Sequence, residues 1–247
     1  MEYSELFSRT ELLIGSAAMQ QIASKKVILF GLGGVGSWCA EGLIRSGIMH
    51  LTLVDSDRVA AANINRQLPA TTGTIGELKA EVMKKRLQEI NPHAGITAIP
   101  EIYSAPSSEL FHLEQYDYII DAIDSLSHKA HLLNTASRTG ATVFSSMGAA
   151  LKLDPQQIRV AEFWKVRGCK LAAALRQQMK KGEKPAKKIF CVYSEEMLTN
   201  KGEEALKMAD ENSSFKKARI NGTMVQVTAV FGFTLAGLVI QDIVNLI

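Results

Sequence analysis

A glycine-rich motif marks the part of the chain best suited to bind a phosphate. Gly31, Gly33 and Gly36 form a G-x-G-x-x-G pattern, with Gly34 inside it, between an apolar run and a helical pattern. Such glycines let the backbone turn tightly and approach a phosphate, and the helix that follows offers free N–H groups and a positive dipole at its N-terminus. The motif therefore predicts a nucleotide site.

Charged and polar side chains after this motif bear on which nucleotide it binds. Asp55 ends the next apolar run, at the distance of about 20 residues where a carboxylate commonly binds ribose hydroxyls. Alone, this pattern is most typical of NAD or FAD, so an NAD-dependent oxidoreductase stays open as an alternative. Two cations and an acid near the expected phosphates suit ATP better, because cations neutralise phosphates and a carboxylate can hold Mg²⁺. The polar candidates beyond Asp55 are Asp57, Asn63, Arg66, Gln67, Lys79 and Asp124. They imply attack of a substrate carboxylate on the α-phosphate, with release of pyrophosphate.

Apolar runs that alternate with amphipathic segments must position these residues. The expected strands are Val27–Phe30, His50–Asp55, Ile96–Ile102, Tyr118–Ala122 and Thr142–Ser146. The expected helices are Ser37–Ser46, Glu77–Ile90, Ser107–Leu113 and Ser127–Arg138, after a helical stretch from Glu5 to Ala23 that Gly15 interrupts. Short apolar strands separated by helices are typical of a parallel sheet covered on both faces. We therefore expect an α/β fold with a doubly wound, Rossmann-like, mostly parallel sheet and a C-terminal extension.

Composition excludes several classes of protein. The chain has 247 residues, of which 47% are apolar and 21% charged, as in ordinary globular domains and unlike a disordered or collagen-like chain. Its three cysteines, Cys39, Cys169 and Cys191, form no CxxC pair, which argues against a zinc ribbon and favours a reducing, cytoplasmic location. Thr223 to Gln241 carries no charge, yet its polar and glycine residues favour a buried core helix over a membrane span. His128 and His131 have no third ligand in view and are interpreted as surface residues.

The second part of the chain differs in charge. We expect a single domain over residues 1–247, with a nucleotide-binding half at 1–150 and an extension at 151–247. The stretch from Lys165 to Lys188, called the basic segment below, holds nine Lys or Arg residues and one acid, and its end from Lys180 to Lys188 is expected to be a mobile loop. Most such charge runs are solvated surfaces, although this one could also follow the phosphates of a nucleic acid.

Five stretches of the first half resemble the ubiquitin-activating-enzyme-like adenylating superfamily. They are RTELLIG at Arg9–Gly15, GLGGVGS at Gly31–Ser37, LVDSDRVAAANINRQ at Leu53–Gln67, GELKAEVM at Gly76–Met83 and DAIDSLSHK at Asp121–Lys129. The resemblance implies that Asn63, Arg66 and Lys79 contact the phosphates of ATP, that Asp55 holds the ribose, and that Asp124 binds Mg²⁺. It also implies that Arg9 reaches into the active site of a partner subunit, hence a homodimer. Arg9, Arg66, Lys79 and Asp124 are the expected catalytic residues.

The second half resembles the branch of tRNA threonylcarbamoyladenosine dehydratases. The matching stretches are LDPQQIRVAEF at Leu153–Phe163, KLAAALRQQMKK at Lys170–Lys181, FCVYSEE at Phe190–Glu196 and NGTMVQVTAVFGF at Asn221–Phe233. The resemblance implies adenylation of the threonine carboxylate of the modified adenosine in tRNA, then cyclisation by its own carbamoyl group, with tRNA on the basic segment. An intramolecular nucleophile needs no enzyme thiol.

One departure and three rival functions remain. Some members of this branch have a cysteine where residues 214–222 here have none, so a sulfur-transfer protein partner acting there is doubtful. An activator of a ubiquitin-like sulfur carrier, an NAD-dependent oxidoreductase and a nucleotide-sensing tRNA-binding module are the alternatives.

Overall fold

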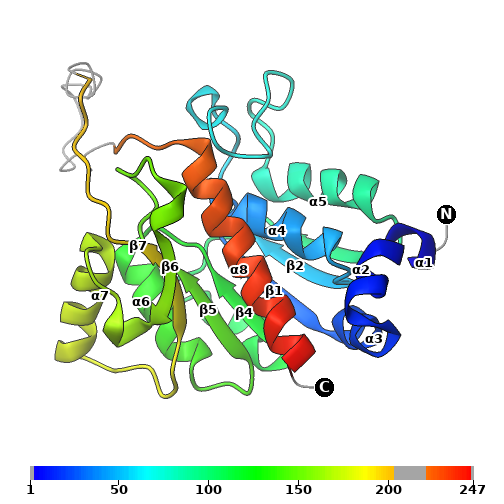
Figure 1. Cartoon of the computed structure of the whole chain (residues 1–247). Coiled ribbons are helices and arrows are strands. Elements are labelled where there is room, and N and C mark those ends of the chain that lie inside the picture. The colour runs from blue at the N-terminus through cyan, green and yellow to red at the C-terminus, as the bar shows by residue number, and fades with distance from the viewer. Residues whose placement is uncertain (1–2, 203–220, 246–247) are drawn as a thin grey trace.

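A seven-stranded sheet forms the centre of the molecule (Figure 1). The computed structural model describes residues 3–202 and 221–245. The strands are β1 Lys26–Phe30, β2 His50–Val54, β3 Gly95–Ile99, β4 Tyr118–Asp121, β5 Thr142–Ser146, β6 Ile158–Glu162 and β7 Phe190–Ser194. Their spatial order is β3-β2-β1-β4-β5-β7-β6, and only the β6–β7 pair is antiparallel. The predicted α/β, mostly parallel sheet is confirmed.

The strand order reverses between β1 and β4. From β1 the chain adds β2 and then β3 on one side, and later returns to add β4 and β5 on the other. Connections leaving in opposite directions open a crevice at the carboxyl ends of the two central strands, where open α/β sheets bind ligands. The glycine loop follows β1 and Asp124 follows β4, so both lie at this crevice.

Alternating apolar residues give the sheet two buried faces. Val27 and Leu29 point to one face of β1, whereas Ile28 and Phe30 point to the other. The first face is covered by α3 Ser16–Ser24, α4 Gly36–Arg45, α5 Lys79–Ile90 and α8 Val225–Asn245. The second face is covered by α6 Leu126–Ala136 and α7 Lys170–Lys181.

Most of the uncharged C-terminal segment lies in α8, which crosses the first face of the sheet (Figure 1). By length and composition alone this helix could cross a membrane, and half of its most apolar window is buried. Phe231 and Leu235 are fully buried in the same core as α4. A Cβ at Gly232 would lie 2.5 Å from the carbonyl oxygen of Val35, so the glycine permits this close approach of α8 to the start of α4. The predicted core helix is confirmed.

Some predicted elements differ from the structure. The expected helix at Ser107–Leu113 is instead two short 3₁₀ turns, Ser108–Phe111 and Leu113–Gln115, because His112 between them has a left-handed φ of 43°. The strand expected at Ile96–Ile102 ends earlier, at Ile99. The opening helical stretch is α1 Tyr3–Leu6, α2 Ser8–Ile14 and α3, with the predicted break at Gly15, where φ is 83°. Strands β6 and β7 were not predicted.

Candidate functional site

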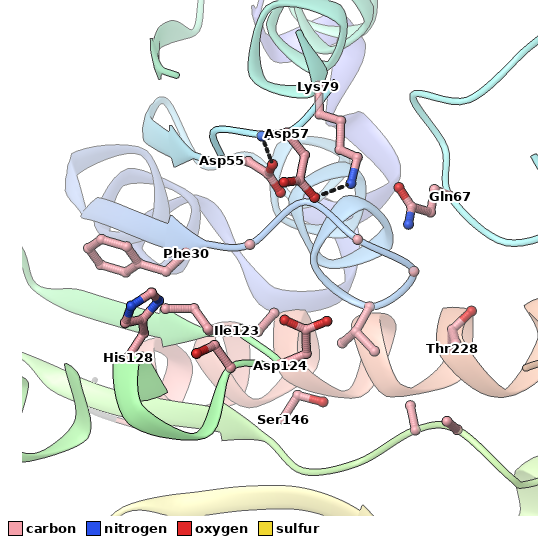
Figure 2. Close-up of a pocket in the computed structure, with 18 of the residues that line it drawn as sticks. Phe30, Asp55, Asp57, Gln67, Lys79, Ile123, Asp124, His128, Ser146 and Thr228 are labelled. Atoms are coloured by element: carbon pink, nitrogen blue, oxygen red, sulfur yellow. Dashed lines mark hydrogen bonds and ion pairs between the residues drawn. The ribbon is translucent and has the colours of Figure 1, made fainter. Parts of the chain in front are cut away.

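A cavity of about 700 Å³ opens at the reversal point of the sheet. Figure 2 shows Asp55, Asp57 and Lys79 grouped on one side of the glycine loop, and Asp124 and Ser146 grouped on the other. The predicted site residues that line it are Gly31, Gly33, Gly34, Asp55, Asp57, Asn63, Arg66, Gln67, Lys79 and Asp124. Of the predicted residues, Gly36 and Arg9 do not line it.

The glycine loop is shaped by close backbone contacts. Gly31 has a φ of +89°, and a Cβ there would lie 2.7 Å from the carbonyl oxygen of Ala122. A Cβ at Gly36 would lie 1.8 Å from the carbonyl oxygen of Gly31. Only a glycine at position 36 therefore allows the loop to turn this tightly. No side chain caps the N-terminus of α4. The N–H of Ser37 already donates to the carbonyl of Gly33 at 3.1 Å, so what this helix end offers an anion in the cavity is chiefly its positive dipole.

Asp55 joins the end of β2 to the glycine loop. Its carboxylate accepts hydrogen bonds from the backbone N–H of Leu32 at 2.6 Å and from that of Asp57 at 2.8 Å. Burial raises the pKa of Asp55, while the Leu32 hydrogen bond and the charge of Lys79 act against that rise. The carboxylate thus shapes the loop and faces the cavity, where a ribose could lie.

Lys79 presents a nearly buried cation. The side chain is 6% exposed, and Nζ lies 2.8 Å from Oδ2 of Asp57, whose own side chain is 68% exposed (Figure 2). The backbone N–H of Lys79 also donates to the carbonyl of Asp57, at 3.0 Å. Asp57 therefore holds Lys79 in place at the wall of the cavity.

The segment after β2 presents the remaining phosphate-binding candidates. Asn63 ends a 3₁₀ turn, and its Oδ1 accepts a hydrogen bond from the N–H of Ala60 at 3.0 Å. Trp38 of α4 donates from Nε1 to the carbonyl of Arg66 at 3.0 Å, which holds this segment against the glycine loop. Oε1 of Gln67 is buried and has no hydrogen-bond partner among the described residues. A buried polar atom at a cavity wall without a partner is suited to a ligand.

Asp124 lies in the turn between β4 and α6. It is exposed and lines the cavity. Within the described ranges there is no group of three His, Cys, Asp or Glu residues able to hold a metal. Mg²⁺ is often bound through one carboxylate, waters and substrate phosphates, and Asp124 fits that role.

The far wall of the cavity was missed by the sequence reasoning. It consists mostly of small and polar residues that end or follow β5 or that lie before or in the first turns of α7 and α8, namely Ser146, Gly148, Ala149, Ala150, Leu171, Asn221, Thr223 and Thr228. The only available signal was the run of small residues after a predicted strand. His128 also lines the cavity and His131 is half-buried, with Nδ1 3.1 Å from the hydroxyl of Tyr103. Their interpretation as surface residues is therefore wrong.

Arg9 lies outside the cavity of its own chain. It is exposed on α2, close to Leu12 and Leu13, which are 86% and 84% exposed. In Figure 1, α2 lies at the opposite side of the molecule from α7. An action of Arg9 in a partner's site stays a prediction.

All three cysteines are buried, as predicted for Cys39 and Cys191. Burial raises the pKa of both of these thiols far above its usual range. Cys169 is 7% exposed. A thiolate is the nucleophilic form of cysteine, so none of the three presents an attacking thiol at the surface. Residues 203–220, which include most of the stretch without the branch's cysteine, lie outside the described residues.

The basic segment divides into exposed and anchored cations. Arg176 donates to the carbonyl of Phe163 at 3.2 Å. Lys187 donates to the carbonyl of Thr139 at 2.9 Å and to that of Ala141, and burial lowers its pKa. The stretch expected to be a mobile loop thus begins inside α7, which ends at Lys181, and is fastened by Lys187. The exposed cations are Lys165, Arg167, Lys170, Lys180, Lys181, Lys184 and Lys188.

Comparison with known proteins gives matches over nearly the whole chain. Residues 7–246 match the ThiF family. The chain is 34% identical over 241 residues to the tRNA threonylcarbamoyladenosine dehydratase of Bacillus subtilis, covering 97% of this chain and 94% of that protein. The crystal structure of the Escherichia coli tRNA N6-threonylcarbamoyladenosine dehydratase in complex with ATP matches with a TM-score of 0.86 and 33% identity, over 98% of this chain and 95% of that one. A sulfur carrier protein adenylyltransferase of Thermus thermophilus is 32% identical, but over only 50% of this chain and 45% of that protein.

Proposed function

Because the chain belongs to the ThiF family, we propose that it is an ATP-dependent enzyme that cyclises threonylcarbamoyladenosine in tRNA with net loss of water. One observation carries the proposal: ten predicted nucleotide-site residues line a single cavity at the sheet's reversal point, in a chain similar along its whole length to proteins named for this reaction. The match to a sulfur-carrier activator stops at about half the chain, which disfavours that alternative.

The cavity accounts for binding of ATP. Its ribose would lie against Asp55, and its phosphates over the glycine loop and the start of α4, where N–H groups and the helix dipole favour an anion. Lys79 and Arg66 supply positive charge, and Asn63 and Gln67 supply neutral polar groups. Lys79 is almost excluded from water, and low solvent access strengthens its attraction to a phosphate.

Magnesium would be held by Asp124 together with the phosphates. When bound, it neutralises charge that develops on the pyrophosphate leaving group. Asp124 stands on the opposite side of the glycine loop from Lys79 in Figure 2. A carboxylate and a cation of the protein would therefore approach the phosphate chain from two sides.

The first step joins substrate and nucleotide. A carboxylate oxygen of the threonyl group attacks the α-phosphorus, the bond from that phosphorus to the bridging oxygen of the β-phosphate breaks, and pyrophosphate leaves. Lys79 and Arg66 offset the charge on the five-coordinate phosphorus. The wall of Gly148, Ala149 and Ala150 leaves room for the substrate beside the phosphates.

The second step needs no nucleophile from the protein. The carbamoyl group of the same nucleoside attacks the activated carbonyl carbon, AMP leaves with one former carboxylate oxygen, and a ring closes. Nucleophile and carbonyl share one molecule, so their effective concentration is high. The burial of all three cysteines agrees with a reaction that proceeds without an enzyme thiol.

The basic segment is proposed as the tRNA surface. Leu171, in the first turn of α7, lines the cavity, so α7 leads from the reacting site toward the exposed lysines at its far end. Seven exposed cations would contact phosphates without reading sequence. Arg176 and Lys187 are excluded from this role because backbone carbonyls hold them.

Four further parts of the proposal concern the molecule as a whole. We propose a homodimer in which Arg9 completes the partner's cavity. Residues 1–247 would act as one adenylating domain, since β6 and β7 of the second half extend the sheet of the first. A cytoplasmic location stays a prediction. A sulfur-transfer partner would find no exposed thiol on this chain.

Exchange of pyrophosphate into ATP, measured with and without threonylcarbamoylated tRNA, tests the function. The expected result is tRNA-dependent exchange, release of AMP, and a nucleoside that mass spectrometry finds lighter by one water. Stimulation by a small protein ending in Gly-Gly would favour the sulfur-carrier activator instead. A fluorescence response to NADH and none to ATP would favour the oxidoreductase. Asp124→Ala with unchanged function would favour a nucleotide-sensing tRNA-binding module.

A further inference from the structure

A fully buried ion pair lies next to the turn that carries Asp124. Nζ of Lys129 lies 2.6 Å from Oδ2 of Asp121, and both side chains are 0% exposed. Asp121 ends β4, and Lys129 lies in the first turn of α6. Taking two charges out of water is unfavourable, and apolar residues of similar volume often give equal or greater stability. The pair therefore calls for a role other than stabilising the fold.

The two charges hold both backbone polar groups of Ile123. The N–H of Ile123 donates to Oδ1 of Asp121 at 3.1 Å, and Nζ of Lys129 donates to the carbonyl of Ile123 at 2.9 Å. Ser145 of β5 fixes the carboxylate further, because its hydroxyl donates to Oδ2 of Asp121 at 2.6 Å. Asp124 is the next residue along the chain. Its backbone position is therefore determined by the buried pair.

The same turn also packs against the glycine loop. The N–H of Ala122 donates to the carbonyl of Phe30 at 2.8 Å, and the carbonyl of Ala122 occupies the space that a Cβ at Gly31 would need. A cation near the N-terminus of α6 opposes the helix dipole, so Lys129 depends on the carboxylate of Asp121. The ion pair thus holds the turn that contacts the glycine loop at one end and carries Asp124 at the other.

We propose that Asp121 and Lys129 are positioning residues that act through Asp124: they orient its carboxylate toward the phosphates and the metal, while they leave the nucleoside end of the cavity unaffected. This inference rests on the proposed function of Asp124. It assigns the alignment of Asp124 to a buried pair that does not itself line the cavity but holds the lining residue Ile123 beside it.

The test uses the full-length double variant Asp121→Leu/Lys129→Met, which leaves no buried charge unpaired. Hydrogen exchange is measured first, because it needs no turnover. The amide of Ile123 loses its acceptor, so the peptide spanning residues 121–126 should exchange at least about tenfold faster, with β1 and α4 unchanged. AMP affinity should stay within about twofold of wild type, whereas kcat should fall by about 100-fold and the Mg²⁺ requirement should rise.

Asp124→Ala supplies the decisive comparison. Added to the double variant, it should cause little further loss of kcat, because residues that act through one group are not additive. Full additivity would overturn the proposal, as would a wild-type rate and Mg²⁺ requirement in the folded double variant. Equal loss of AMP binding would also overturn it, since the pair would then support the whole cavity. If wild-type protein converts no tRNA, the proposed function fails, yet the exchange of the turn still reports the positioning itself.

A matched pair and a single variant serve as controls. Glu41→Leu/Arg86→Met removes another ion pair, between the buried Glu41 and the partly exposed Arg86, which joins α4 to α5 and does not line the cavity. It should leave the exchange of residues 121–126 and the Mg²⁺ requirement unchanged. If the double variant at the turn fails to fold, Asp121→Asn keeps the size of the side chain. Its kcat and Mg²⁺ titration are then judged by the same outcomes, whereas its exchange should change little, because the amide oxygen of the asparagine can still accept from the N–H of Ile123.

Discussion

At the scale of single residues, some side chains at the cavity already have hydrogen-bond or ion-pair partners, whereas others have a polar atom that a ligand could bind. Asp55 uses both carboxylate oxygens on backbone N–H groups, and Lys79 is paired with Asp57. Gln67 Oε1 is buried without a partner among the described residues. A free protein that keeps its cation ordered by a neighbouring acid loses less side-chain entropy when a phosphate arrives. We therefore expect Asp57 to keep Lys79 ordered for the phosphates of ATP.

Lys79→Met should weaken ATP binding while leaving adenosine binding nearly unchanged. A hydrogen bond to a charged partner contributes about 1.5–3 kcal/mol, so the Kd for ATP should rise roughly 10- to 100-fold. Isothermal titration with ATP and with adenosine measures both. Lys85→Met, at an exposed position of the same helix, should change neither. A parallel loss of adenosine affinity would mean that Lys79 supports the cavity and not the phosphates.

Ten site residues could be predicted because each follows a recognisable local pattern. Asp55 and Asp124 come after apolar strands, and strand ends of a parallel sheet meet at one edge. Thr228 carries no such local signal. It reaches the cavity only because α8 packs beside the glycine loop through long-range contacts, which no short stretch of sequence encodes.

At the scale of elements, the central strands could be predicted from the sequence, whereas the strands at one edge of the sheet could not. β1 and β4 are mostly apolar strands buried on both faces, and their sequences predict them well. β6 lies at the sheet edge, where Arg159 and Val160 are both exposed. An edge strand lacks the regular apolar pattern of a buried one, so it was missed, and β7 with it. Its antiparallel pairing with β7 is a tertiary feature.

The contact between α4 and α5 depends on one carboxylate. Glu41 accepts hydrogen bonds from Arg86 at 2.6 Å and Arg45 at 2.9 Å. Burial would raise the pKa of Glu41, but the hydrogen bonds and charges of the two arginines outweigh burial and lower it. A pKa that is lower in the folded than in the unfolded chain stabilises the protein above the ordinary glutamate range. That stabilisation is lost as the pH falls through the lower, folded value.

Glu41→Gln should therefore destabilise the protein at neutral pH and much less in acid. Removing one charged partner of a buried hydrogen bond lowers the free energy of unfolding by about 1–3 kcal/mol. Urea unfolding at a series of pH values measures the difference from wild type, which should shrink once Glu41 is protonated in the folded wild type. Glu81→Gln, at an exposed position of α5, is the control. A difference that stays constant into acid would contradict the assigned cause.

At the scale of the whole molecule, the cavity lies between two exposed surfaces of opposite character. α7 carries exposed cations on one side, and α2 carries the exposed Leu12 and Leu13 on the other (Figure 1). Polyanions bind through released counterions, and apolar surface favours burial against protein. We therefore expect tRNA to bind on the α7 side and a second subunit on the α2 side.

Charge reversal on α7 should weaken tRNA binding without affecting ATP. Lys180→Glu/Lys181→Glu removes two exposed cations, so the slope of log K against log salt should fall by about 0.7–0.9 for each phosphate that the variant no longer neutralises. Filter binding over a salt series measures it. Lys187→Met is the matched control, because carbonyl groups already hold that ammonium. An equal change of slope in both variants would remove the distinction between exposed and anchored cations.

Mixed dimers test whether Arg9 acts across the subunit interface. Arg9→Ala and Asp124→Ala should each abolish cyclisation, but co-expression with two affinity tags yields dimers that contain one chain of each kind. In such a dimer the intact cavity of the Arg9→Ala chain receives Arg9 from its partner. One of the two sites is then complete, so about half of wild-type activity should return. Co-expressed Lys79→Met and Asp124→Ala chains are the control. Both residues line the cavity of their own chain, so each of the two cavities in the mixed dimer carries one substitution and activity should stay absent. Recovery in the control as well, or in neither mixture, would mean that Arg9 does not serve the partner's site.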